Sequence, residues 1–204
     1  RVLFRSNPDW LDIFDAEALE RPRRAVGMRR ELGRLLRKLD GDESLAAVRR
    51  FKQREMVRIA ARDLARLGEV AEITRELSHV ADTCLSVMLK ICQVDLQKCL
   101  GKPWHRDVNG HWRESPFSLI GLGKLGGQEL NDSSDVDVVL VYEEEGQVSK
   151  TEPRETNVEG HFTSHEFFNR LTEEFIAAVG AVTEDGQLYR IDFRLRPEGN
   201  SGPL

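Results

Sequence analysis

The fold and the candidate site are decided by one stretch of sequence, Gly126-Gly127-Gln128-Glu129-Leu130-Asn131-Asp132-Ser133-Ser134-Asp135-Val136-Asp137, followed by Val138-Val139-Leu140-Val141. A glycine pair opens it, a polar turn follows, and two aspartates lead into an apolar run that is typical of a buried strand. Side chains at i and i+2 of a strand point to the same face, so Asp135 and Asp137 are expected to lie side by side. Two like charges held so close need a cation or a proton to offset their repulsion. Because Mg²⁺ takes such oxygen ligands together with substrate phosphates, the stretch predicts metal-assisted transfer of a nucleotidyl or phosphoryl group.

The glycines upstream allow three interpretations. Gly121-Leu122-Gly123-Lys124-Leu125-Gly126 satisfies the dinucleotide-binding pattern G-x-G-x-x-G. A parallel β-α-β crossover needs a dozen or more residues, however, and only about nine separate Gly126 from Val136. A Walker-type loop is excluded because Lys124 precedes Gly126 and no Gly-Lys-Ser/Thr follows. The remaining interpretation is a glycine turn that enters a carboxylate-bearing strand, where N–H groups of Gly126 and Gly127 and a hydroxyl of Ser133 or Ser134 can hold phosphate.

A third carboxylate is expected from the alternating segment 188–195. Tyr189, Ile191 and Phe193 fall on one side of this predicted strand, and Arg190, Asp192 and Arg194 on the other. Asp192 can complete a metal cluster and act as a base, or it can simply pair with Arg190 or Arg194. Arg194 and Arg196 can bind phosphate bidentately; the alternative is structural pairing with Glu198 or the acidic run.

The first half of the chain has helical periodicity. Helices are predicted over about 15–39, from Asp42 or Ser44 to Leu67, and over 70–101, packing as antiparallel neighbours. The second helix carries an arginine at every fourth position (Arg50, Arg54, Arg58, Arg62 and Arg66). A solvated face partly paired with Glu55 and Asp63 is the favoured interpretation, and a docking surface for an acidic partner or the acidic second half is the alternative.

After Pro103 the period changes. Strands are predicted over 117–120 and 136–142, a polar loop over 147–160, and a helix from Ser164 to Val179 with Ser164 as its cap. We therefore predict an α+β protein, with a helical lead-in over 1–102 and a catalytic core over 103–204 that has a small mixed sheet flanked by helices.

Composition restricts the class of protein. Residues 1–100 carry 20 Lys and Arg against 16 Asp and Glu, whereas residues 101–204 carry 10 against 19. An acidic half that contains the paired aspartates favours a metal-dependent site over a nucleic-acid surface. The absence of a long apolar run argues against a membrane span. The three cysteines (Cys84, Cys92 and Cys99) suit small core residues of a protein from the reducing cytoplasm.

Several blocks resemble one family. Residues 123–131 and 133–137 are similar to the hallmark of glutamine synthetase adenylyltransferases, which are bifunctional enzymes with two polymerase-beta-like nucleotidyltransferase domains. Residues 192–199 and 201–204 resemble the second block of that family, and residues 51–64 resemble the helical segment that precedes its catalytic domain. Because the chain starts at Arg1 and stops at Leu204 directly after a candidate loop, we expect it to be a piece of a longer protein.

The resemblance implies a function. Asp135, Asp137 and Asp192 would bind Mg²⁺, with Gly126, Gly127, Ser134, Arg194 and Arg196 at the nucleotide phosphates. The residues in these blocks are closer to those in the N-terminal half of the family's enzymes. That half uses inorganic phosphate to remove AMP from a tyrosine of glutamine synthetase, giving ADP. The C-terminal half attaches AMP from ATP, and this direction stays open, as does a regulatory domain that binds nucleotide without turnover. The implied partners are glutamine synthetase and, through the full-length enzyme, a PII-type signalling protein, with no nucleic acid or membrane.

Overall fold

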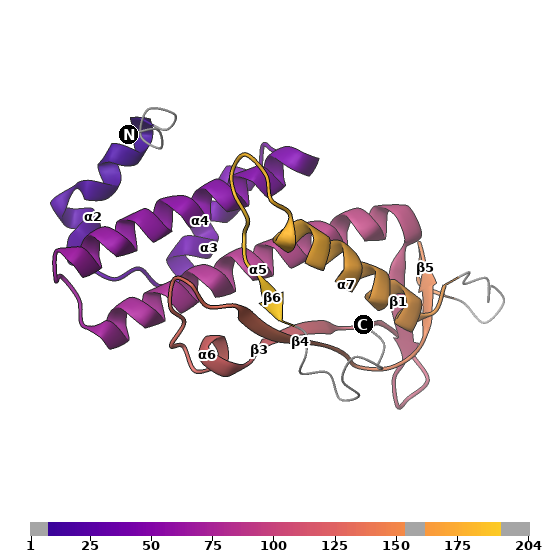
Figure 1. Ribbon diagram of the computed structural model, residues 1–204. Helices are drawn as coiled ribbons and strands as arrows, with labels where there is room; N and C mark the ends of the chain where they lie inside the picture. Colours follow the sequence, from indigo (N-terminus) through magenta and orange to yellow (C-terminus); the bar gives the residue numbers. More distant parts are fainter. Residues whose placement is uncertain (1–7, 154–161, 193–204) are drawn as a thin grey trace.

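A computed structural model describes residues 8–153 and 162–192. It has an α+β architecture in which helices pack on two small sheets (Figure 1). The helices are η1 (Pro8–Phe14), α2 (Ala16–Glu20), α3 (Ala25–Leu36), α4 (Gly41–Leu64), α5 (Val70–Leu100), α6 (Gly123–Gly126) and α7 (Ser164–Gly180). The strands are β1 (Lys102–Arg106), β2 (Trp112–Glu114), β3 (Phe117–Gly121), β4 (Val136–Tyr142), β5 (Gln147–Ser149) and β6 (Ile191–Asp192).

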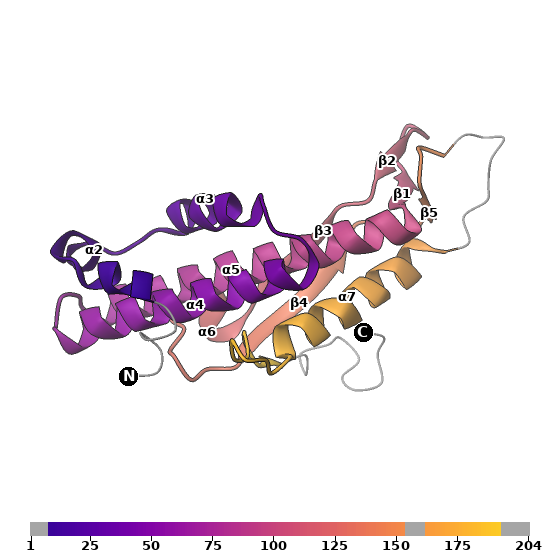
Figure 2. The same cartoon turned by 90° about the horizontal axis from the view of Figure 1, so that it is seen from above.

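The first predicted helix is two helices. The prediction of one helix over 15–39 is wrong, because α2 ends at Glu20 and α3 starts at Ala25. The residue before a proline is pushed out of the helical region, and Arg21, which precedes Pro22, is extended with φ −123° and ψ 140°. The long helices α4 and α5 match the other two predictions closely and pack along each other (Figure 2).

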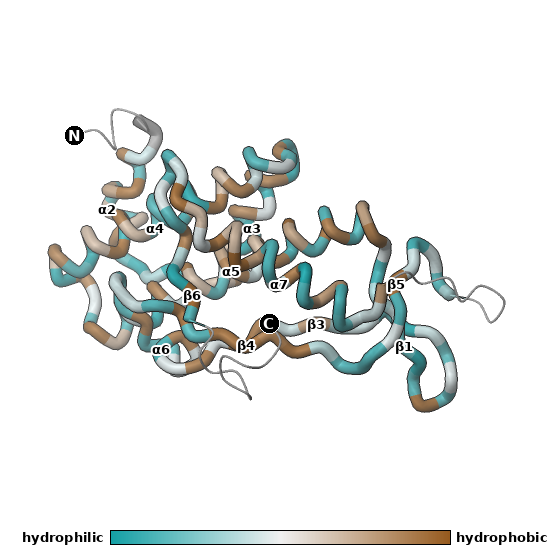
Figure 3. The backbone as a smooth tube through the Cα atoms, turned by 45° about the vertical axis from the view of Figure 1, so that its right-hand side comes forward, coloured by the Kyte–Doolittle hydropathy of each residue, from teal (hydrophilic) through white to brown (hydrophobic). Residues whose placement is uncertain are grey.

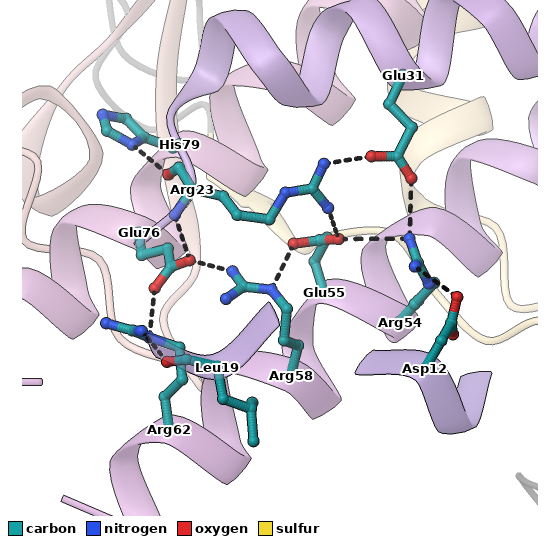
Figure 4. Close-up of polar contacts among 10 residues, drawn as sticks. All are labelled: Asp12, Leu19, Arg23, Glu31, Arg54, Glu55, Arg58, Arg62, Glu76 and His79. Carbon is teal, nitrogen blue, oxygen red and sulfur yellow. Dashed lines mark hydrogen bonds and ion pairs between the residues drawn. The ribbon is translucent and has the colours of Figure 1, made fainter. Parts of the chain in front are cut away.

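Two members of the arginine ladder do not lie on a solvated face. Arg58 and Arg62 are fully buried, and they pair with glutamates of α4 and α5 (Figure 4). Arg58 Nε donates to Glu55 Oε2 at 3.0 Å, and its Nη2 pairs with Glu76. Arg62 Nε lies 3.2 Å from Glu76 Oε2. The predicted pairing with Glu55 is present, but the prediction of a solvated face is wrong for Arg58 and Arg62, because their carboxylate partners lie within the helical layer, where water is excluded.

The two sheets have the strand orders β2-β1-β5 and β3-β4-β6. β4 has the predicted bounds and is largely hydrophobic (Figure 3). It pairs antiparallel with β3 and parallel with β6. An antiparallel β3–β4 pair, joined by a helix of only four residues, confirms that this is not a dinucleotide-binding crossover.

Three short strands escaped the sequence analysis. β5 lies inside the predicted loop 147–160, where it pairs with β1, and β1 also pairs with β2. Residues 154–161 of that loop lie outside the described part. The helix α7 begins at Ser164 as predicted, but its cap is Thr163, whose hydroxyl accepts from Glu166 N at 3.1 Å while Thr163 N donates to Glu166 Oε2 at 2.8 Å.

One buried cluster joins the helices to the β3-β4-β6 sheet. It includes Val80 and Cys84 of α5, Val136 and Val138 of β4, and Phe175 of α7. The predicted division at residue 102 thus coincides with the change from helices to strands, while the core runs across it. Among the described helices, none is both long and apolar enough to cross a membrane.

Candidate active site

The candidate site lies where β6 meets the start of β4 (Figure 1). In this parallel pair Val136 is the register partner of Ile191, and Asp137 is the partner of Asp192. Val136 is buried and Ile191 packs against the same core cluster. Because side chains alternate along a strand, Asp137 and Asp192 project together from the opposite, outer face of the sheet. The structure therefore brings two of the three predicted carboxylates side by side.

The outer face of this sheet is open around the carboxylates. Asp137 and Asp192 are half-buried, and Ile120 of β3 and Val141 of β4 are 46% and 45% exposed.

Asp135 precedes β4 and has a different partner. Its Oδ1 accepts a hydrogen bond from Arg190 Nε at 2.6 Å. Arg190 in turn is fixed by its backbone, since its carbonyl accepts from Val136 N at 2.9 Å. Among the described residues there is no group of three or more His, Cys, Asp or Glu side chains that could hold a metal ion. The predicted cluster of three is thus present as an in-register pair and a third carboxylate that is paired with a guanidinium.

The glycine turn approaches Asp137 closely. Gly123 has φ +51°, and a Cβ at this position would lie 2.6 Å from Asp137 Oδ2. Only glycine fits there, because a side chain would both strain the backbone and collide with the carboxylate. Leu122 N also donates to the Asp137 carbonyl at 2.8 Å. The turn is therefore built against the carboxylate. The sequence predicted a glycine turn that enters this strand, but it did not predict the contact of Gly123 with Asp137.

Gly126 and Gly127 shape the turn. Their N–H groups donate to the carbonyls of Leu122 and Gly123, both at 2.9 Å. A Cβ on Gly126 would lie 2.6 Å from the Gly121 carbonyl oxygen. The N–H groups at the open end of α6 belong to Gly123, Lys124 and Leu125, because the first turn of a helix has no internal acceptors for them.

Ser134 is half-buried and lies beside this turn. Its Oγ donates to Asn131 Oδ1 and accepts from Lys124 Nζ at 3.4 Å. Lys124 is exposed, so its ammonium and the Ser134 hydroxyl form a polar edge next to Asp135. Arg194 and Arg196, the predicted phosphate ligands, lie outside the described residues.

Residues of α4 fix the segment that leads into β6, and the sequence analysis missed them. Arg49 Nη2 donates to the Ala178 carbonyl at 2.6 Å, and Arg50 Nη1 to Asp185 Oδ2 at 3.1 Å. Lys52 Nζ bonds the Leu188 carbonyl and lies 4.2 Å from the centre of the Tyr189 ring. Gln53 Nε2 donates to the Asp185 carbonyl at 2.5 Å. Three side chains of α4 thus hold the connection between α7 and Asp192, and a fourth, that of Arg49, bonds the end of α7 itself.

The environment of Lys52 is unusual for a lysine. Burial lowers its pKa, and Cys84 nearby opposes that change. Burial likewise raises the pKa of the Cys84 thiol, to about 12. The arginine repeat on this helix was visible in the sequence, but Arg49, Lys52 and Gln53 lie outside it. Their acceptors are backbone carbonyls, which a pattern of side chains does not reveal.

Comparisons with known proteins agree with these observations. A family model described as "Glutamate-ammonia ligase adenylyltransferase" matches residues 2–204. Three relatives carry the name "Bifunctional glutamine synthetase adenylyltransferase/adenylyl-removing enzyme". The relative from Nitrosococcus oceani is 40% identical over 162 residues, which is 79% of this chain and 16% of the relative. The one from Pseudomonas aeruginosa is 37% identical over 195 residues, or 95% of this chain and 19% of the relative. The one from Aromatoleum aromaticum is 33% identical over all 204 residues, and 20% of its length is matched.

The chain thus spans a fifth or less of the length of the curated relatives it matches. The family model covers nearly every residue, including both blocks on which the resemblance rests. The chain belongs to the glutamate-ammonia ligase adenylyltransferase family.

Proposed function

We propose that this chain catalyses Mg²⁺-dependent nucleotidyl transfer on glutamine synthetase, in the direction that removes AMP. Inorganic phosphate would attack the phosphorus of the tyrosine-bound AMP, the bond from phosphorus to the tyrosine oxygen would break, and ADP and a protonated tyrosine would leave. The observation that carries the proposal is the in-register pair of Asp137 and Asp192, next to a glycine turn that touches Asp137. The names of the relatives support the substrate.

The carboxylates fit a hard divalent ion. Asp137 and Asp192 offer oxygen ligands from adjacent strands, and Gly123 lets the backbone of the turn approach Asp137 closely. We infer that Asp135, Asp137 and Asp192 hold Mg²⁺, which would neutralise charge on the nucleotide phosphates. The other contribution of the protein would be to position the phosphate and the AMP-tyrosine, since phosphate needs little activation as a nucleophile.

Other residues have supporting roles in the proposal. Ser134 and Lys124 would contact phosphate oxygens at the edge of the turn, while Gly126 and Gly127 give the turn its shape. Arg194 and Arg196 would bind the nucleotide phosphates or the incoming phosphate. In the attachment direction Asp192 would accept the tyrosine proton. We also infer a cytoplasmic location, and a PII-type protein that acts on the full-length enzyme.

The test is incubation of the chain with AMP-modified glutamine synthetase, Mg²⁺ and phosphate, with ADP as the readout. We expect ADP to form, and Asp137→Asn and Asp192→Asn to abolish its formation without lowering the melting temperature. A matched control is Asp95→Asn on the exposed face of α5. If the chain instead attaches AMP from ATP, the direction is reversed. A chain that binds Mg²⁺·ADP but turns over neither substrate is the regulatory domain.

A further inference from the structure

Within the described part of the chain, the Arg190 guanidinium lies against Asp135, one of the three carboxylates of the candidate site. Arg190 and Asp192 are two residues apart, so both point to the outer face of β6 or its extension, as Asp137 does on β4. The bond from Val136 N to the Arg190 carbonyl continues the parallel ladder toward Asp135. Asp135 therefore faces Arg190 in the same way that Asp137 faces Asp192.

The pair formed by Arg190 and Asp135 competes with metal binding. Arg190 Nε lies 2.6 Å from Asp135 Oδ1, the distance of a charge-assisted hydrogen bond. An oxygen engaged in this way has one fewer lone pair for a cation. The described carboxylates form no group of three that could hold a metal, and Asp135 is paired with the Arg190 guanidinium. The ion pair and a three-carboxylate site are two alternative arrangements of the same side chains.

We propose that Arg190 is the resident cation of Asp135 and that a divalent metal must displace it to bind all three carboxylates. The inference rests on the proposed function and makes Arg190 a positioning residue that sets the metal affinity. In the absence of metal, its charge offsets the repulsion among the carboxylates. When metal arrives, the guanidinium leaves Asp135 and extends into solvent, which its 68% exposed side chain permits.

The expected size of the competition follows from that exposure. The Asp135 side chain is 44% exposed, so the pair is screened by water. Removing an exposed competing pair should tighten metal binding by about two- to five-fold, equivalent to about 0.4–1 kcal/mol at 1.4 kcal/mol per tenfold change. The opposite role, in which Arg190 orients Asp135 toward the metal, predicts weaker binding when Arg190 is replaced.

The test measures binding of Mn²⁺ alone to the full chain, from the loss of the free Mn²⁺ resonance in paramagnetic resonance spectra. Arg190→Gln should bind Mn²⁺ about two- to five-fold more tightly than the parent chain. Arg190→Lys keeps the positive charge but loses the planar guanidinium group. Its Mn²⁺ affinity should therefore lie between those of the parent chain and Arg190→Gln. Arg113→Gln is the matched control, because Arg113 forms a similar exposed pair with Asp107 at 2.8 Å away from the site. Its Mn²⁺ affinity should equal that of the parent.

Unchanged or weaker Mn²⁺ binding by Arg190→Gln overturns the inference. The failure of the proposed function gives a different result, which Asp137→Asn detects. If Asp137→Asn binds Mn²⁺ as well as the parent does, there is no metal site at these carboxylates and both proposals fall. If Asp137→Asn loses binding while Arg190→Gln gains none, only the role of Arg190 is refuted.

Discussion

Arg58 of α4 and Glu76 of α5 form an ion pair in which neither side chain reaches solvent, the exposed fractions being 2% and 0%. Arg58 also pairs with Glu55, and Arg23, in the segment between α2 and α3, reaches both glutamates through its side chain and its backbone N–H. The pairs thus tie three successive parts of the chain together at one buried point (Figure 4). A buried charge is tolerated only while its partners remain, so the network is more sensitive to the loss of one member than a surface pair is.

Arg58→Met should strongly destabilise the protein. The substitution leaves Glu55 and Glu76 buried without their main cation, at a cost of about 3–5 kcal/mol. Thermal or urea unfolding followed by circular dichroism measures the change. Arg66→Gln is the control, because Arg66 belongs to the same ladder of arginines spaced four residues apart but is exposed. It should change the free energy of unfolding by less than about 0.5 kcal/mol. Equal effects of the two substitutions would show that the buried pairing contributes nothing specific.

Glu31 should give the network an acid-sensitive component. Burial acts to raise its pKa, but hydrogen bonds and charges from Arg23 and Arg54 outweigh it, and the net pKa lies below 4.5. A carboxyl whose pKa is lower in the folded than in the unfolded protein stabilises the fold above its unfolded-state pKa. This stabilisation is lost as the pH falls through the folded-state pKa. The difference in unfolding free energy between the parent and Glu31→Gln should therefore be largest near neutral pH and shrink below pH 4.5. Exposed Glu20→Gln serves as the control. A difference that stays constant from pH 6 to pH 3 would contradict this linkage.

The sequence predicted those features that depend on local pattern. β4 and α5 follow from an uninterrupted apolar run and from a long three–four periodicity, and both were placed to within a residue. Alternation on two predicted strands led to the expectation that Asp192 joins Asp135 and Asp137. The register that pairs Asp192 with Asp137 could not be predicted, because no pattern fixes a register between segments 55 residues apart. The short strands β1, β2 and β5 are three to five residues long, too few to show a period.

Tertiary contacts decided what the sequence could not. A ladder of arginines on a helix looks the same whether water or glutamates face it. The glutamates that pair with Arg58 and Arg62 come from 10 to 18 residues away on α5 as well as from α4 itself. The role of Gly123 was hidden for a similar reason. Its φ of +51° and its closeness to Asp137 depend on how the turn folds back on β4.

Cysteine labelling should separate the three thiols. The expectation that all three are core residues is wrong for Cys99, which is exposed, whereas Cys84 and Cys92 are buried. Burial raises the pKa of Cys84 to about 12 and that of Cys92 to about 11, so neither forms the reactive thiolate near neutral pH. In native protein at pH 8, a thiol reagent should modify one cysteine rapidly, and Cys99→Ser should remove that fast phase. Rapid modification of two or more thiols in the folded protein would contradict the packing of α5.

Lys52→Met should affect both stability and the candidate site, because Lys52 bonds the carbonyl of Leu188, four residues before Asp192. A partly buried carbonyl that loses its donor costs about 1–3 kcal/mol, and the segment before β6 loses an anchor. We expect lower stability and, at a temperature where the variant is fully folded, a lower kcat for ADP formation with little change in KM.

Lys52→Arg keeps a donor and should recover part of both losses, whereas Lys90→Met, on an exposed position of α5, should change neither. If Lys52→Met loses stability but keeps the parent kcat, α4 holds this segment without positioning Asp192. If it changes neither quantity, the bond to Leu188 does not contribute.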